Sequence, residues 1–252
     1  MERIDDLNLN GKKIIQDTDL FLFGMDSVLL SNKVKGTNKD TVIVDLGTGS
    51  CVMPVIIAEK NEVRKIIGVE LQDRMYELAL KNIKYNKLET KIEVLKDNLK
   101  NISNIRQYIK ETVGRDNVDI VISNPPYKKV GTGSKNDVDE KYIARHEVEC
   151  DLEDVFKTSS KLLKFKGKLY IVHKPERIAD LITLARKYNL EPKTIQFLQP
   201  KIDKKPSIVL VEYVLGGGNE CIVLPNLIEY DKEGNYTKDI LDIYGMNNME
   251  NI

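Results

Sequence analysis

Strand-like and helix-like segments alternate along the chain from residue 41 to residue 188, and this alternation limits the possible folds more than any other feature. The expected strands are short runs rich in β-branched residues, and the expected helices repeat apolar residues at helical spacing. Strands that alternate with helices form βαβ units, so we expect an α/β protein with a doubly wound, mostly parallel sheet. The expected strands are residues 41–46, 65–71, 91–95, 118–123 and 168–173, and the expected helices are residues 52–60, 72–85, 102–112, 152–163 and 176–188.

Two more extended stretches, residues 194–198 and 208–215, follow the last of these helices and are joined by a short connection. Such a pair is typical of an antiparallel hairpin at the edge of a parallel sheet, and it brings the expected sheet to seven strands. We therefore expect one main domain at residues 41–216, with an N-terminal extension at residues 1–40 that packs on it and a C-terminal extension at residues 217–252.

Each extension is expected to contain one short helix. In the N-terminal extension, residues 19–24 resemble a turn or short hairpin, and residues 26–34 resemble a helix capped by Asp26. In the C-terminal extension, residues 237–244 have helical character, and residues 247–252 are expected to fray at the chain end.

The charges of the chain balance, because Lys and Arg together number 39 and Asp and Glu together also number 39. No net field therefore draws the chain to nucleic acid, and a polyanion would need a local basic patch. The apolar runs fall short of the roughly 18 to 20 residues that span a bilayer, and the acidic N-terminus lacks the apolar core of a signal peptide. We therefore expect a cytoplasmic protein without a membrane segment.

The cysteines and histidines show no pattern of a disulfide framework or a metal site. Cys51, Cys150 and Cys221 are far apart and odd in number, which argues against both disulfides and a zinc knuckle. His146 and His173 complete no metal-ligand spacing. We therefore expect a protein of a reducing compartment without a bound metal. Nothing in the sequence indicates an obligate interface, so we also expect a monomer.

The fourth expected strand, residues 118–123, runs directly into Asn124-Pro125-Pro126-Tyr127. Proline cannot donate a backbone hydrogen bond and fixes its own φ, so two prolines end the strand in a rigid shelf. The shelf carries an amide side chain and an aromatic ring at the carboxyl end of a strand, where open α/β sheets bind ligands. An amide beside a ring suits a planar group that bears an NH2.

Three earlier strand ends also carry residues of the kind that bind ligands. The segment Asp45-Leu46-Gly47-Thr48-Gly49-Ser50-Cys51 follows the first strand, and its glycines allow the backbone to approach a ligand closely. Glu70 ends the second strand, where a carboxylate can accept both hydroxyls of a ribose. Asp97, beside Asn98, follows the third strand and can accept from an adenine amino group. Four consecutive strand ends of this kind predict a ligand site at one edge of the sheet.

The glycine spacing discriminates between two classes of cofactor. The dinucleotide fingerprint is G-x-G-x-x-G, and here Gly47 and Gly49 are followed by no glycine at position 52. A pyrophosphate needs an unobstructed helix N-terminus, whereas S-adenosylmethionine carries no phosphate and does not. The loop therefore favours S-adenosylmethionine over a dinucleotide.

Asp45-Leu-Gly-Thr-Gly, Glu70, Asp97 and the Asn124-Pro-Pro-Tyr127 motif together resemble the class I S-adenosylmethionine-dependent methyltransferases that methylate amino groups. Further segments narrow the resemblance to the bacterial valine-tRNA adenine-37 N6-methyltransferase family, over nearly the whole chain. These segments are Phe21-Leu22-Phe23 with residues 26–30, residues 144–147 (Ala-Arg-His-Glu), residues 172–178 (Val-His-Lys-Pro-Glu-Arg-Ile) and residues 224–237 of the tail.

The resemblance implies a Rossmann-like methyltransferase fold, S-adenosylmethionine as cofactor, and tRNA as substrate, bound at its anticodon region. The implied cofactor contacts are Asp45, Gly47, Thr48, Gly49, Glu70, Leu71, Asp97, Asn98 and Asn124. The implied catalytic residues are Asn124, Pro125, Pro126 and Tyr127, and the implied substrate contacts are Tyr127, Lys128 and Arg145. The chain departs from the family at Cys51, where the loop usually carries a third glycine and where a non-glycine residue disfavours positive φ.

The expected chemistry is methylation of the exocyclic N6 of an adenine. The Asn124 side-chain oxygen and the Pro125 carbonyl can accept the two amino hydrogens, which aims the nitrogen lone pair at the methyl carbon. Tyr127 is expected to stack on the base. No strong general base is required, because the nitrogen becomes acidic as it is methylated.

Three other functions are still open from the sequence. A protein glutamine N5-methyltransferase would use the same shelf on a side-chain amide, but such enzymes typically carry a separate N-terminal helical domain, and residues 1–40 are too few for one. A DNA or ribosomal RNA adenine methyltransferase would use the same chemistry on another nucleic acid. A non-catalytic module that binds RNA or S-adenosylmethionine is the third, and Cys51 is the only indication for it.

Several side chains have two interpretations. The lysines of residues 128–141 and 201–205 are candidates for RNA contact or for ordinary solvated loops. His146 is interpreted as a structural hydrogen-bonding residue rather than a base. Phe21 and Phe23 are candidates for covering the cofactor or for filling the core.

Overall fold

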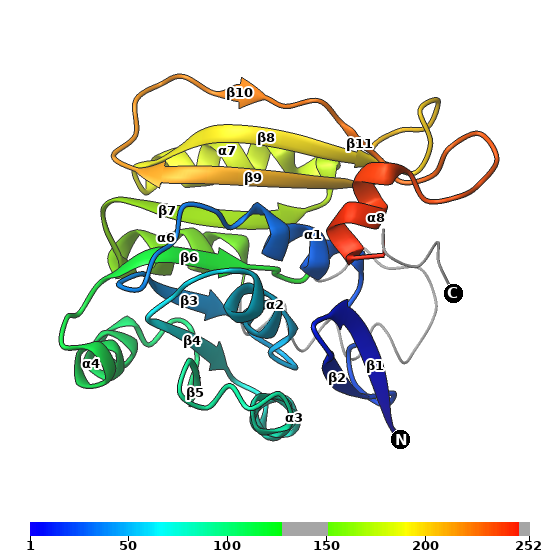
Figure 1. Ribbon diagram of the computed structural model, residues 1–252. Coiled ribbons are helices and arrows are strands. Elements are labelled where there is room, and N and C mark those ends of the chain that lie inside the picture. The colour runs from blue at the N-terminus through cyan, green and yellow to red at the C-terminus, as the bar shows by residue number, and fades with distance from the viewer. Residues whose placement is uncertain (128–150, 247–252) are drawn as a thin grey trace.

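The computed structural model describes residues 1–127 and 151–246, which form a large sheet covered by helices and a separate two-stranded hairpin (Figure 1). Within these residues the large sheet has the order β10-β8-β9-β7-β6-β3-β4-β5, and β11 pairs with β8. Its long strands are β3 (Val42–Leu46), β4 (Lys65–Glu70), β5 (Ile92–Lys96), β6 (Val118–Ser123), β7 (Leu163–His173), β8 (Leu190–Gln199) and β9 (Ile208–Leu215).

These seven strands are the ones that the sequence predicts. Strands β3 to β7 pair in parallel, and β9 is antiparallel to both β7 and β8, which makes the predicted edge hairpin. Strand β7 begins at Leu163 rather than at residue 168, and β8 begins at Leu190 rather than at residue 194. Two short strands outside the predicted seven, β10 (Ile222–Val223) and β11 (Leu227–Ile228), extend the sheet beyond β8.

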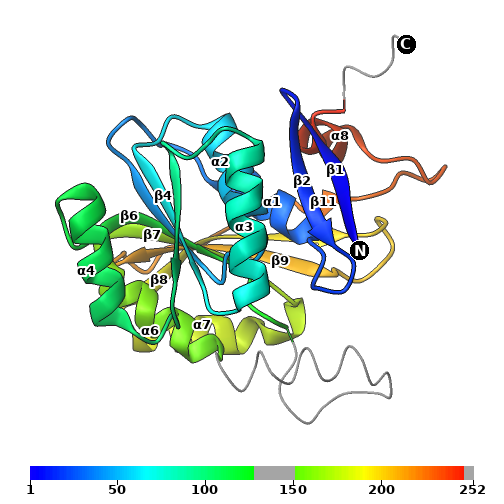
Figure 2. The same ribbon diagram turned by 90° about the horizontal axis from the view of Figure 1, so that it is seen from below.

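Helices cover both faces of the sheet, namely α2 (Val52–Lys60), α3 (Asp73–Tyr85), α4 (Ile102–Val113), α6 (Leu152–Leu162) and α7 (Ile178–Lys187). Side chains of a strand alternate between the two faces. In β3, Ile43 packs in one hydrophobic cluster with α2 and α3, and Val44 packs in a second cluster with α4, α6 and α7. Figure 2 shows these two groups of helices on opposite sides of the sheet. The predicted doubly wound arrangement is therefore confirmed.

A hairpin at the N-terminus, β1 (Glu2–Leu9) paired with β2 (Lys12–Asp17), is absent from the sequence prediction. Strand β2 lies along α3, where two asparagine side chains bind its backbone. The Asn82 amide accepts from the nitrogen of Ile15 at 2.7 Å and donates to its carbonyl at 3.0 Å. Asn86 binds the nitrogen and the carbonyl of Lys13 in the same way, at 3.0 and 2.7 Å. The hairpin is thereby attached to the helix that follows β4.

The predicted helix of the N-terminal extension is α1 (Met25–Lys33), and its N-cap is Gly24. The predicted capping role of Asp26 is wrong, because Asp26 lies inside the first turn of the helix. Its carboxylate instead accepts from the backbone nitrogen of Ser27 at 2.9 Å and from the hydroxyl of Tyr127 at 2.5 Å. Asp26 therefore connects this extension to the shelf after β6.

The predicted C-terminal helix is α8 (Lys238–Tyr244), which lies beside α1 (Figure 1). The side chains of Asn32 in α1 and Lys60 in α2 both donate to the carbonyl of Ile243, at 3.4 and 3.1 Å. The boundaries at residues 40 and 216 stay predictions, and residues 247–252 lie outside the described part of the chain. Among the residues that the structure describes, none of the helices combines the length and the apolar character needed to cross a membrane.

Candidate active site

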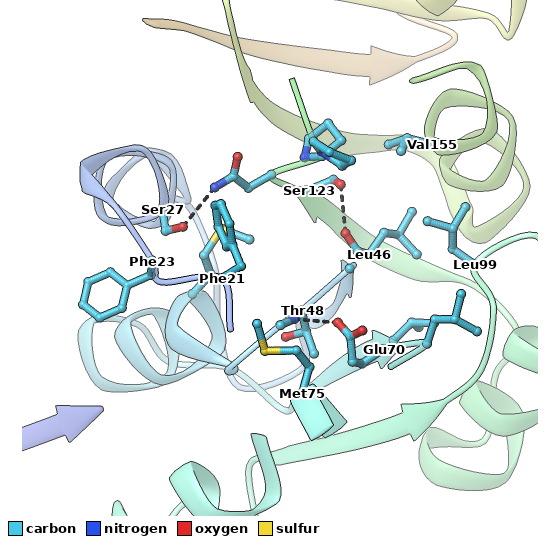
Figure 3. Close-up of a pocket in the computed structure, with 18 of the residues that line it drawn as sticks. Phe21, Phe23, Ser27, Leu46, Thr48, Glu70, Met75, Leu99, Ser123 and Val155 are labelled. Atoms are coloured by element: carbon cyan, nitrogen blue, oxygen red, sulfur yellow. Dashed lines mark hydrogen bonds between the residues drawn. The ribbon is translucent and has the colours of Figure 1, made fainter. Parts of the chain in front are cut away.

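A cavity of about 660 Å³ opens at the carboxyl ends of β3, β4, β5 and β6 (Figure 3). Parallel strands end at the same edge of a sheet, so the residues that follow them meet there. The predicted residues that line the cavity are Gly47, Thr48, Gly49, Glu70, Leu71, Asp97, Asn98, Asn124, Pro125, Pro126 and Tyr127. Lys128, Arg145, His146 and the lysines of residues 128–141 lie outside the described residues. The individual roles of all these residues stay predictions.

The loop after β3 folds over the end of β4. The backbone nitrogens of Gly47 and Thr48 both donate to the carbonyl of Val69, at 3.0 and 3.1 Å. Gly47 and Gly49 have φ of +76° and +57°, a conformation that residues with a Cβ rarely adopt. Apart from the glycine itself and its two neighbours in the chain, no heavy atom lies within 4 Å of the position that a Cβ would take at either glycine. The backbone of this loop is therefore open to close approach by a ligand.

Cys51 adopts the left-handed conformation that a third glycine would supply, with φ of +69° and ψ of +23°. A left-handed non-glycine residue costs on the order of 1 to 2 kcal/mol. Three local features oppose this cost: the amide donates to the carbonyl of Thr48 at 3.0 Å, the carbonyl accepts from Val55 at 3.1 Å, and the side chain is fully buried. The loop therefore keeps its path into α2 although the glycine is missing.

Glu70 ends β4 and is only 5% exposed, yet it lines the cavity. Its Oε2 accepts from the backbone nitrogen of Gly49 at 2.8 Å, and its Oε1 accepts from that of Gln72 at 2.9 Å. Figure 3 shows the carboxylate facing the loop that carries Thr48. One side chain therefore joins the glycine loop to the start of α3, and Leu71 beside it adds an apolar surface that is 37% exposed.

Asp97 follows β5 and is bound to polar groups at the start of α4. Its Oδ1 accepts from the backbone nitrogen of Asn98 at 2.7 Å and from the side-chain nitrogen of Asn101 at 2.6 Å. Its Oδ2 accepts from the side chain of Asn104 at 2.5 Å. These bonds hold the half-buried carboxylate at the cavity wall, where the predicted contact with an adenine amino group would be made.

Asp45 differs from the other predicted contacts, because it lies beneath the loop and does not line the cavity. The residue is fully buried, its Oδ2 accepts from the hydroxyl of Thr48 at 2.7 Å, and its Oδ1 has no partner among the described residues. Burial raises the pKa of Asp45 to about 7; the hydrogen bond from Thr48 opposes this rise, and the charge of Glu70 adds to it.

Asp45 is expected to make the stability of the protein depend on pH. Between about pH 4 and pH 7 the folded state binds this proton and the unfolded state does not, so stability falls as pH rises. Asp45→Asn removes the titration and keeps an acceptor for Thr48. Relative to the wild type, its free energy of unfolding in urea should rise by roughly 2 to 4 kcal/mol from pH 4.5 to pH 7.5. Asp239→Asn, at an exposed position of α8, is the control. A difference that is the same at both pH values would contradict the prediction.

The shelf leaves β6 beside the end of β3 and faces α1. Ser123, the last residue of β6, donates to the carbonyl of Leu46 at 2.9 Å. The side-chain nitrogen of Asn124 lies 3.0 Å from the hydroxyl of Ser27, and its side-chain oxygen lies 2.9 Å from the hydroxyl of Tyr127. Figure 3 shows the contacts made by Ser27 and Ser123. The amide of Asn124 is therefore held at both ends.

The ring of Tyr127 contacts two residues at the end of β7. The ring of His173 lies at a centroid distance of 5.1 Å and an angle of 59°, and the ammonium of Lys174 lies 5.1 Å from the Tyr127 centroid. Burial and the charge of Arg177 together lower the pKa of His173 to about 4, with burial the larger cause, so the imidazole is neutral near pH 7. Stacking of Tyr127 on a base stays a prediction.

Several cavity residues come from elements that the sequence analysis did not connect with the site. Apart from Phe21 and Phe23, they include Ser27 of α1, Lys174 and Glu176 after β7, Ser207 before β9, and the apolar residues Met53, Met75, Leu99 and Val155. Both Phe21 and Phe23 line the cavity; Phe21 is 57% exposed, whereas Phe23 also packs against the core. Ser27, Lys174 and Glu176 carried a signal, because they lie in segments that the family resemblance singles out. Within residues 1–127 and 151–246, no group of three or more His, Cys, Asp or Glu side chains is placed to hold a metal ion.

The family model of the methyltransferase small domain matches residues 24–186, which are more than half of the chain. The chain belongs to the methyltransferase small domain family. This confirms the predicted class of enzyme, a methyltransferase that uses S-adenosylmethionine.

Two similar proteins are both named tRNA1(Val) (adenine(37)-N6)-methyltransferase. The protein from Porphyromonas gingivalis is 24% identical over 170 residues, which are 68% of this chain and 64% of that protein, so the match spans less than two thirds of that relative. The protein from Flavobacterium johnsoniae is 23% identical over 230 residues, which are 90% of this chain and 92% of that protein.

A solved structure with a similar fold is that of a predicted O-methyltransferase from Agrobacterium tumefaciens. The TM-score is 0.67 at 20% sequence identity, and the superposition covers 88% of this chain and 97% of that chain. This similarity confirms the predicted fold class.

Proposed function

We propose that this protein transfers a methyl group from S-adenosylmethionine to the exocyclic N6 of an adenine in tRNA. The observation that carries the proposal is the shelf from Asn124 to Tyr127 at the wall of the cavity, where an amide and a ring can receive a planar amino group. The names of the relatives support adenine-37 of a valine tRNA as the target. We further infer that the protein acts as a monomer in the cytoplasm and binds the anticodon region.

The lining of the same cavity supports S-adenosylmethionine as the cofactor. When bound, S-adenosylmethionine supplies a methyl group on a sulfonium, which is an activated leaving group. Gly47 and Gly49 would allow its close approach to the loop, Glu70 would accept the ribose hydroxyls, and Asp97 would accept from the adenine amino group. The cavity volume of about 660 Å³ is within the usual range of roughly 300 to 1,000 Å³ for small-molecule sites.

The shelf residues orient the nitrogen that is methylated. The lone pair of an exocyclic amino group is delocalised into the ring, so the nitrogen is a poor nucleophile until its hydrogens are held. The Asn124 side-chain oxygen and the Pro125 carbonyl accept these hydrogens and direct the lone pair toward the methyl carbon, and Tyr127 holds the plane of the base. The neutral His173 lies behind Tyr127 and supports its ring.

The proposal is tested by offering labelled S-adenosylmethionine with total tRNA, a release-factor protein and DNA in parallel reactions. We expect label in tRNA, and nucleoside analysis should identify the product as N6-methyladenosine. Label in the protein but not in RNA would replace the proposal by glutamine methylation, and label in DNA alone would replace it by DNA methylation. Calorimetry that finds no binding of S-adenosylmethionine would favour a non-catalytic module.

Lys174 is expected to contribute to binding of tRNA. It lines the cavity and holds its ammonium over Tyr127, and within the described residues no carboxylate forms an ion pair with it. Lys174→Ala should raise KM for tRNA by roughly three- to tenfold and reduce the slope of log affinity against log salt by about one, because one phosphate contact is lost. The dissociation constant for S-adenosylmethionine should not change.

Lys84→Ala is the matched control for Lys174→Ala, since Lys84 is an exposed lysine in the last turn of α3, away from the cavity. Its KM and salt slope should equal those of the wild type. A Lys174→Ala variant with unchanged KM and salt slope would show that the ammonium meets no phosphate.

A further inference from the structure

Two polar side chains of α1 lie against the shelf and have no part in the reaction as described so far. The carboxylate of Asp26 is 2.5 Å from the hydroxyl of Tyr127, and the hydroxyl of Ser27 is 3.0 Å from the amide of Asn124. Ser27 is 4% exposed, so its hydroxyl is removed from bulk water. The helix from the N-terminal extension therefore meets both functional side chains of the shelf.

The hydroxyl of Tyr127 faces two oxygen atoms but has only one proton to donate. One oxygen is Oδ2 of Asp26 at 2.5 Å, and the other is Oδ1 of Asn124 at 2.9 Å. The shorter distance is that of an O–H donor to a charged acceptor. Burial and the negative charge of Asp26 raise the pKa of Tyr127, so the hydroxyl keeps its proton and donates it to Asp26.

The group of Asn124 that faces Tyr127 must then be a donor, because the Tyr127 proton is already used. The two ends of a carboxamide have nearly the same shape, and the hydrogen-bond network decides which end faces which partner. With the nitrogen toward Tyr127 and the oxygen toward Ser27, each contact has one proton. The orientation described above, with the oxygen toward Tyr127 and the nitrogen toward Ser27, would leave two oxygens 2.9 Å apart without a proton between them, so the amide is assigned the other way round.

We propose that Asp26 and Ser27 are positioning residues that set the orientation of the Asn124 amide. Asp26 accepts the hydrogen bond that the Tyr127 hydroxyl donates, the Tyr127 oxygen accepts from the Asn124 nitrogen, and the Ser27 hydroxyl donates to the Asn124 oxygen. A carbonyl oxygen accepts two hydrogen bonds, so the second remains for the amino group of the substrate. The proposal rests on the proposed function only in that Asn124 receives an amino group.

The test is a double-mutant cycle between Asp26 and Tyr127, in which kcat is measured for each variant. In Asp26→Ala the Tyr127 hydroxyl donates its hydrogen bond to Asn124 instead, which turns the amide, and we expect kcat to fall by roughly 10- to 100-fold. Tyr127→Phe removes the hydroxyl, and we expect a smaller loss of roughly 5- to 10-fold. The double variant should be no slower than Tyr127→Phe alone, because Asp26 has no proton left to direct. Losses that multiply would overturn the proposal.

Ser27→Ala should lower kcat by roughly 5- to 10-fold, because the amide loses the donor at its oxygen. Ser31→Ala is the matched control, since Ser31 is a buried serine of the same helix that donates to the Ser27 carbonyl at 2.7 Å without touching the shelf. Equal losses in the two serine variants would assign Ser27 to helix stability and overturn its role. The dissociation constant for S-adenosylmethionine should stay within about threefold in every variant.

Asp26→Asn keeps an acceptor oxygen for Tyr127 and tests the proposal if Asp26→Ala does not fold. We expect a loss in kcat smaller than about fivefold, and a loss as large as that of Asn124→Ala would contradict the assignment. The cycle uses whichever acceptor the wild type methylates. If that acceptor is a protein amide, the proposed function fails while the role of Asp26 is still decided by the cycle.

Discussion

Asn124→Ala is expected to lower kcat by roughly 10²- to 10³-fold, which is the usual effect of removing one positioned hydrogen-bond group from a transition state. The amide is held by contacts at 3.0 and 2.9 Å with Ser27 and Tyr127, so its position is set before substrate arrives. Alanine removes the acceptor for one amino hydrogen, and the lone pair is no longer directed at the methyl carbon. Steady-state methylation of tRNA measures the loss.

The same variant should still bind S-adenosylmethionine with a dissociation constant within about fivefold of the wild type, because the loop, Glu70 and Asp97 lie on other strands. Calorimetry measures this constant. Asn226→Ala is the control for an asparagine substitution and should keep full kcat, because Asn226 is exposed between β10 and β11 and does not line the cavity. Turnover of Asn124→Ala at the rate of the wild type would show that the shelf does not hold the reacting amino group.

The long strands and helices could be predicted because their patterns are local. The buried run of β6, Val118–Ser123, and the apolar spacing of α3 each identify the element without reference to the rest of the chain. The hairpin of β1 and β2 could not be predicted in this way. Strand β1 is rich in charged residues, and β2 is held by Asn82 and Asn86, which come more than 60 residues later. A pairing that depends on distant side chains leaves no local pattern.

The candidate site shows the same division between local and distant information. Glu70, Asp97 and Asn124 could be identified because each directly follows a strand, and parallel strands end at one edge. Ser27 and Ser207 could not, because they reach the cavity from α1 and from the β8–β9 connection, which the strand order alone does not place there. Asp26 was predicted as a helix cap rather than as a partner for Tyr127, because a carboxylate at the start of a helix suits either role in sequence.

Glu70→Ala is expected to weaken binding of S-adenosylmethionine by roughly 10²-fold or more. Hydrogen bonds to a charged group are worth roughly 1.5 to 3 kcal/mol each, and about 1.4 kcal/mol is a tenfold change in a dissociation constant. Glu70 holds the nitrogens of Gly49 and Gln72 at 2.8 and 2.9 Å, so its removal frees the loop as well as removing the acceptor for the ribose. Glu70→Gln should bind S-adenosylmethionine nearly as weakly as Glu70→Ala, because the NH2 group of the glutamine would face one of these N–H donors.

Glu93→Ala separates this effect from a general loss of stability. Glu93 lies on β5, where it binds Lys65 at 2.9 Å and Tyr108 at 3.0 Å, and it does not line the cavity. Both alanine variants should unfold at lower urea concentration than the wild type, because each breaks hydrogen bonds of a partly or fully buried carboxylate. Only Glu70→Ala should change the dissociation constant measured by calorimetry. Equal constants in the two variants would mean that the cofactor does not meet the end of β4, and the site would then have to be placed nearer to β6 and α1.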